Sequence, residues 1–188
     1  AHRRVYDKYL HRERQRVLGM LEDMDRNRVA IFRALTKLRQ LALDPVLVDA
    51  EHASGAPSAK VSALVEQVTE LASEGHRALV FSSFTGYLKL VREALSEAGI
   101  SHVYLDGHTR DRPARIAAFR EGEDPVFLIS LKAGGFGLTL TEADYVFVLD
   151  PWWNPAAESQ AIDRTHRIGQ TRSVNVYRMV SEDTIEEK

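Results

Sequence analysis

The sequence contains no cysteine, which excludes disulfide bonds and thiolate ligands to a metal. Its seven histidines show no HExxH motif or comparable ligand spacing, so we expect no metal site. No apolar run approaches the ~18 residues of a membrane span, and the arginine-rich start lacks the apolar stretch of a signal peptide. We therefore expect a soluble, intracellular protein without a membrane partner.

The chain also lacks any Gly-Lys pair, so the phosphate-binding loop GxxxxGK[ST] is absent. No pair of acids follows a strand-like run where it could hold a magnesium ion.

The net charge of −2 does not indicate nucleic-acid binding. Positive charge is concentrated locally, because residues 3–39 hold nine Arg and two Lys against five acids. This excess indicates either a nucleic-acid contact or a solvated helix face.

Residues 5–43 show apolar side chains at three- and four-residue spacing, which predicts a helical arm. Asp44-Pro45 should end it, because the residue before a proline is disfavoured in helical geometry. Gly, Ser and Pro then indicate a linker. We divide the chain into a helical arm over residues 1–49, a linker over 50–59 and a lobe over 60–188.

Helical and strand-like segments alternate through the lobe, which predicts an α/β fold with a parallel sheet flanked by helices. The strand-like runs are residues 77–82, 102–105, 126–130, 145–149 and 174–180. The helical runs are residues 60–72, 87–98, 113–119 and 156–166. Ligands of such sheets bind at the carboxyl ends of the strands, so the loops there are the candidate site.

These loops carry hydroxyls, glycines, a cation and both tryptophans. Ser83 follows the first strand and Thr109 the second, where hydroxyls hold phosphate or close ordinary turns. Lys132 and the glycines of residues 134–137 follow the third strand and could cradle a phosphate. After the fourth, Trp152 and Trp153 are adjacent between two prolines, so at least one is expected to be exposed rather than packed.

The sequence QAIDRTHRIGQ, residues 160–170, follows on a predicted helix. Gln160, Arg164 and Arg167 are spaced four and three apart, so they share one helical face. Two arginines on one face bind an anion, unless solvent or the acids Glu158 and Asp163 satisfy them.

In this order and spacing, the loops resemble motifs IV, V and VI of superfamily 2 helicases, and most closely the Swi/Snf-related branch. The diagnostic stretches are KAGGFGLTLTEAD, DPWWNP and QAIDRTHRIGQ, and RALTKLRQLALDP resembles the helical segment before the second lobe in that branch. The resemblance implies the second of two RecA-like lobes in a double-stranded-DNA-dependent ATPase. Leu131 and Thr139 depart from the family's usual threonine and asparagine.

By the same resemblance, Arg164 and Arg167 would be arginine fingers, with Gln160, Gly135 and Gly137 near the nucleotide. Duplex DNA would meet a further set of residues: Lys132, Trp153, Ser83, Thr109 and Gly134. ATP with Mg²⁺ would be bound mainly by the first lobe of the same polypeptide. This chain alone is therefore expected to be inactive and to hold no nucleotide.

Two other functions remain open at this stage: a lobe of a superfamily 2 RNA helicase, and a non-catalytic interaction module that keeps the fold. A further partner could be a protein in a protein–DNA complex. Without a lysine-rich import cluster, we expect a bacterial cytoplasm with nucleoid association, or the nucleus if the source is eukaryotic.

Overall fold

The computed structural model describes residues 2–133, 140–151, 156, 159, 163 and 171–187. The chain divides into two compact units. One comprises the residues up to Ser58 together with those from Ser181 onward, and the other comprises Ala59–Val180. The borders predicted from the sequence stay a prediction, and the structure groups the last residues with the helical unit rather than with the lobe.

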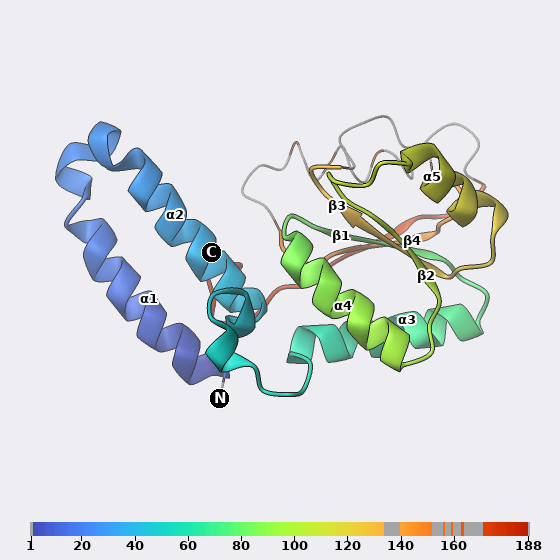
Figure 1. Ribbon diagram of the computed structural model, residues 1–188, viewed down its shortest axis with the longest axis horizontal. Coiled ribbons are helices and arrows are strands. Elements are labelled where there is room, and N and C mark those ends of the chain that lie inside the picture. The colour runs from blue at the N-terminus through green and yellow to red at the C-terminus, as the bar shows by residue number, and fades with distance from the viewer. Residues whose placement is uncertain are drawn as a thin grey trace. The chain divides into compact units, whose positions relative to one another are not determined.

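The predicted helical arm is a hairpin of two helices (Figure 1). Helix α1 covers His2–Leu18 and helix α2 covers Met24–Leu43, with the 3₁₀ turn η1 at Leu21–Asp23 between them. Glycine at position 19 favours the break. The Asp23 side chain then accepts the backbone N–H of Arg26 at 3.3 Å and starts the second helix.

Helix α2 ends where the sequence predicted, at Asp44 before Pro45. Asp44 is extended, with φ −159° and ψ 128°, and its carboxylate accepts the N–H of Val46. Two short 3₁₀ turns follow, η2 at Pro45–Leu47 and η3 at Ala50–His52. The predicted linker thus begins with a turn of helix, and residues 53–58 form neither helix nor strand.

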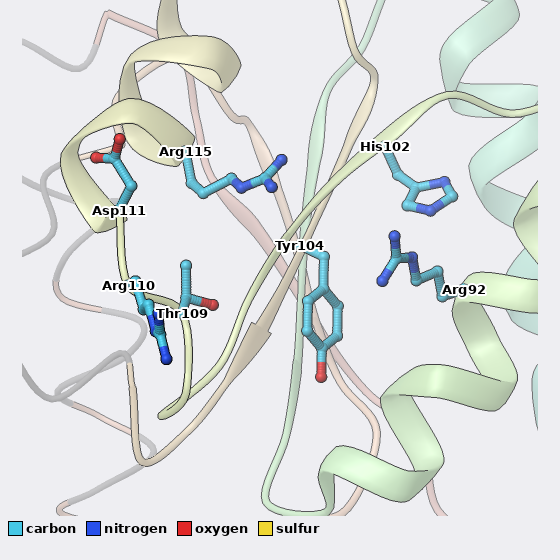
Figure 2. A pocket seen from close by; sticks show the side chains of 7 residues that line it. All are labelled: Arg92, His102, Tyr104, Thr109, Arg110, Asp111 and Arg115. Carbon is cyan, nitrogen blue, oxygen red and sulfur yellow. The ribbon is translucent and has the colours of Figure 1, made fainter.

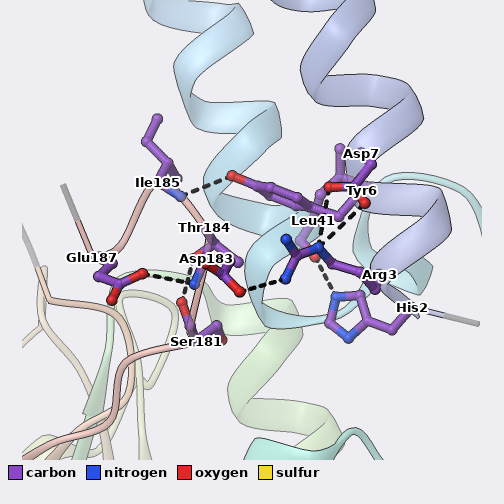
Figure 3. A network of polar contacts seen from close by, with 10 residues as sticks. All are labelled: His2, Arg3, Tyr6, Asp7, Leu41, Ser181, Asp183, Thr184, Ile185 and Glu187. Carbon is purple, nitrogen blue, oxygen red and sulfur yellow. Dashed lines mark hydrogen bonds and ion pairs between the residues drawn. The ribbon is translucent and has the colours of Figure 1, made fainter.

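The C-terminal segment closes the open end of this hairpin (Figure 3). The Arg3 guanidinium lies 2.9 Å from the Asp183 carboxylate, and the backbone N–H of Ile185 donates to the Tyr6 hydroxyl at 2.8 Å. Tyr6 is buried against Leu38 and Leu41. Because the Arg3 pair is exposed and the Tyr6 bond is buried, the second contact should contribute more to stability.

The second unit is a five-stranded parallel sheet with helices on both faces (Figure 1). In chain order its elements are α3 Ala59–Ser73, β1 Ala78–Ser82, α4 Thr85–Glu97, β2 His102–Leu105, α5 Arg112–Glu121, β3 Val126–Ser130, β4 Tyr145–Val148 and β5 Asn175–Arg178. The strand order is β2-β3-β1-β4-β5 and every pairing is parallel. The predicted fold class is confirmed.

Successive side chains of a strand point to opposite faces of the sheet, and both faces of this sheet are buried. Leu79, Phe81 and Ile129 pack with Phe119 of α5 in one cluster. The intervening residues, such as Val80 and Leu128, are also fully buried. Burial on both faces explains why the central strands are continuous apolar runs instead of alternating ones.

Prediction of the strands and helices in this unit succeeded to within about two residues at most ends. The largest differences are two residues, at the start of α4, the end of α5 and the end of β5. Of the predicted helix over residues 156–166, the structure describes Ala156, Ser159 and Asp163, each in helical conformation.

Replacing Tyr6 by Phe should destabilise the helical unit by about 1 kcal/mol, because the N–H of Ile185 loses its buried acceptor. Hydrogen exchange of peptides covering residues 181–187 should accelerate correspondingly. Tyr9→Phe is the matched control, since the Tyr9 hydroxyl has no hydrogen-bond partner among the described residues. Equal exchange in both variants would show that the Tyr6 hydroxyl does not hold the segment.

Candidate functional site

The carboxyl ends of β1, β3 and β4 meet at one edge of the sheet. Ser82 is the register partner of Ser130, and Phe81 is paired with both Ile129 and Val148. The pairing continues past the strands, because the N–H of Leu131 donates to the Ser82 carbonyl at 2.9 Å. Loops that are far apart in the sequence therefore leave the sheet side by side, as its alternating pattern predicted.

A buried carboxylate joins two of these loops. Asp150 is 1% exposed, and both of its carboxylate oxygens lie 3.1 Å from the backbone nitrogen of Ser83. The loop after β4 is thereby fastened to the loop after β1. The Ser83 amide, which the sequence suggested for phosphate, already donates to a protein acceptor.

Lys60 holds a second pair of strand ends. Its ammonium, at the start of α3, lies 2.8 Å from the carbonyl oxygens of both Leu149 and Met179. Residues 149 and 179 follow β4 and β5, so one buried cation fixes two strand ends. Sequence reasoning missed this residue, although a lysine on the apolar face of a helix was an available signal.

The loop after β2 is an Asp106-centred turn. The Asp106 carboxylate accepts the Tyr104 hydroxyl at 2.9 Å and the N–H of His108 at 2.8 Å, while the Thr109 hydroxyl accepts the N–H of Asp106 at 3.0 Å. Burial raises the pKa of Asp106, but these hydrogen bonds outweigh it and hold the pKa below its usual value. Burial and the Asp106 carboxylate raise the pKa of Tyr104 to about 12.

Lys132 differs from these internally paired groups. It follows β3 in a tight turn, closed by the N–H of Ala133 donating to the Ser130 carbonyl at 2.9 Å, and its side chain is exposed. Within the described part of the chain it makes no ion pair or hydrogen bond. It is therefore an exposed cation beside the carboxyl end of β3, and its role as a ligand contact stays a prediction.

Of the predicted site residues, the structure describes Ser83, Thr109 and Lys132. The backbone N–H of Ser83 and the hydroxyl of Thr109 already make hydrogen bonds within the protein, so a phosphate would have to share these groups. Their loops follow β1 and β2, and β3 lies between these two strands in the sheet. The other predicted site residues lie outside the described residues: Gly134, Gly135, Gly137, Trp153, Gln160, Arg164 and Arg167.

The described residues contain no group of three or more His, Cys, Asp or Glu side chains that could hold a metal ion. None of the helices in the described ranges is long and apolar enough to cross a membrane.

The all-parallel sheet, with its loops gathered at the carboxyl edge, is a RecA-like lobe. A crystal structure titled as the C-terminal part of the Fun30 ATPase domain shares this fold with a TM-score of 0.66 and 34% sequence identity. The match covers 81% of this chain and 51% of that one.

Residues 59–169 match the model of the helicase conserved C-terminal domain, and the chain belongs to this family. Its relatives place it in the Swi/Snf-related branch of superfamily 2, as the second RecA-like lobe. This confirms the resemblance inferred from the motifs.

Three curated relatives illustrate the branch, each aligned over 134 residues, or 70% of this chain. Protein CHROMATIN REMODELING 24 of Arabidopsis thaliana is 44% identical, and the DNA repair protein RAD5A of the same plant is 45% identical. The chromatin-remodeling ATPase INO80 of Emericella nidulans is 44% identical. The alignments span only 12%, 13% and 8% of these proteins.

Removing the buried Asp150 carboxylate should loosen the candidate site. Asp150→Ala leaves the Ser83 amide without its acceptor, at an expected cost of about 2–3 kcal/mol. Asp111→Ala is the matched control, because its exposed carboxylate also accepts a backbone N–H, that of Ala114, and its loss should cost only about 1 kcal/mol. Hydrogen exchange of the 83–84 amides measures the difference, and equal effects would contradict the assigned role of burial.

Proposed function

We propose that this chain is the C-terminal motor lobe of an ATP-dependent double-stranded DNA translocase or remodeller. It would supply arginine fingers for ATP hydrolysis and part of the DNA track. The observation that supports this most is the shared carboxyl edge of β1, β3 and β4, where Lys132 is exposed and unpaired among the described residues.

For the nucleotide, the proposal rests on family membership and on the spacing of Gln160, Arg164 and Arg167 in the sequence. A guanidinium beside the terminal phosphate stabilises the negative charge that grows as the phosphoryl group leaves. Gly135 and Gly137 would lie near the same nucleotide. The described residues offer no carboxylate cluster for Mg²⁺, so we assign the ion and most of the ATP contacts to the first lobe.

For DNA, the fixed loops matter as much as the cations. The Asp150 and Lys60 contacts hold the loops after β1, β4 and β5 in place. The N–H of Leu131, next to Lys132, donates to the Ser82 carbonyl and ties the end of β3 to β1. The contact would be completed by Trp153, Gly134, Ser83 and Thr109. Contacts to the phosphate backbone of DNA carry no sequence information, so the lobe should bind duplexes of any sequence.

Two lobes would then divide the work, and this chain alone should neither bind ATP tightly nor hydrolyse it. The names of the relatives suggest chromatin remodelling or DNA repair, with a protein–DNA complex as partner. Those three relatives are eukaryotic, which favours the nucleus if the source is eukaryotic; none supports the bacterial nucleoid that we first expected.

The finger assignment predicts a large loss of turnover. In the full-length protein, Arg167→Ala should lower ATP hydrolysis by roughly 10³-fold or more while ATP binding changes little. Arg167→Lys should not restore it, because lysine lacks the planar fork. Arg12→Ala, an exposed arginine on α1, is the control for simple loss of charge. Turnover of Arg167→Ala within a few-fold of wild type would remove the finger assignment.

The DNA track predicts different behaviour for its cation and its indole. Lys132→Ala in the full-length protein should weaken binding alike on unrelated duplexes and reduce the slope of log affinity against log salt by about one. Trp153→Ala should leave that slope nearly unchanged and reduce DNA-stimulated turnover, because an indole contributes contact area instead of charge.

Lys89→Ala is the matched control, since this exposed lysine lies on α4 and is not among the proposed DNA contacts. Wild-type affinity, slope and turnover in both track variants would show that DNA does not run over these loops.

A further inference from the structure

A concave surface, separate from the loops after β1, β3 and β4, lies beside the edge strand β2 (Figure 2). It is a pocket of about 350 Å³. Its lining residues are Arg92, His102, Tyr104, Thr109, Arg110, Asp111 and Arg115. They come from α4, from β2, from the loop after β2 and from α5, so no single sequence motif predicts the pocket.

Tyr104 forms a fixed aromatic wall of this pocket. Its hydroxyl donates to Asp106 at 2.9 Å, which sets the direction of the ring. The Arg92 guanidinium carbon lies 5.2 Å from the ring centre, a cation–π distance. This contact orients Arg92 without neutralising its charge.

The charge in the pocket is mostly positive. Figure 2 shows the Arg115 guanidinium directed into the space before Tyr104, while the Asp111 carboxylate points away from it. That carboxylate accepts the N–H of Ala114 at 3.1 Å and caps α5. Among the described residues, neither Arg110 nor Arg115 has an ion-pair partner, so the lining leaves guanidinium groups for an external anion.

Unpaired guanidinium groups around a concave wall suit a phosphate, because the planar fork donates to two of its oxygens. Thr109 belongs both to this pocket and to the loop that we propose as a DNA contact. If the DNA backbone contacts Thr109 at the strand edge, the pocket therefore lies directly beside that DNA.

We propose that this pocket binds a backbone phosphate of duplex DNA, with Arg115 and Arg92 as the principal contacts and Arg110 at its margin. The inference rests on the proposed function and extends the DNA track from the strand-end loops to the outer edge of the sheet. The track is then wider than the family's loop motifs alone would make it.

The test compares Arg115→Ala and Arg92→Ala with Lys89→Ala, which removes an equal charge from an exposed position of α4 outside the pocket. In the full-length protein, each pocket variant should weaken duplex binding about 3- to 10-fold and reduce the salt slope by about one. Arg115→Lys should keep the slope and recover only part of the affinity. Lys89→Ala should bind as wild type does.

Three outcomes would overturn the proposal in distinguishable ways. If the pocket variants bind DNA normally and Lys132→Ala does not, the pocket lies off the track while the proposed function stands. If all of these variants bind normally, the DNA track itself fails. If inorganic phosphate or a phosphopeptide shifts the NMR signals of Tyr104 and duplex DNA does not compete for the site, the pocket serves a phosphorylated protein instead.

Discussion

Parallel pairing of β1 with both β3 and β4 is the constraint on which the rest of the lobe depends. It requires every crossover to return to the same end of the sheet, so all the strand-end loops share one edge. A change of register by one residue would exchange the side chains that face the two helical layers and so disrupt the packing on both faces, which fixes the strand ends as firmly as the core. Topology therefore gathers the strand-end loops at one edge before any particular side chain is considered.

In the described part of the lobe, several negative side chains make hydrogen bonds within the protein, while two of the exposed positive ones do not. Aspartates at strand ends and helix starts accept backbone N–H groups and so hold the chain in place; they are Asp106, Asp111, Asp144 and Asp150. Lys132 and Arg115 make no such contacts among the described residues. A chain with net charge −2 can therefore still present exposed cations beside the strand ends, because these positions are not paired with the aspartates.

The sequence allowed the strands and the fold class of the lobe to be predicted because strand burial and helix periodicity are local signals. The hairpin was not predictable in the same way, since apolar spacing continues through the turn and only Gly19 and the Asp23 cap mark it. Asp150 was noticed as part of a motif, but its bond to Ser83 joins residues 67 apart in sequence. The arginine pocket needs three separate elements to come together, which periodicity does not reveal.

Under the proposed function, this lobe belongs to a motor that is driven by ATP hydrolysis and stimulated by duplex DNA. Its most direct test is the ATPase rate of the full-length protein with no nucleic acid, with duplex DNA and with RNA, at one fixed salt concentration. We expect strong stimulation by duplex DNA of unrelated sequences and little by RNA. Equal stimulation by RNA, or a rate that does not depend on nucleic acid, would contradict the account.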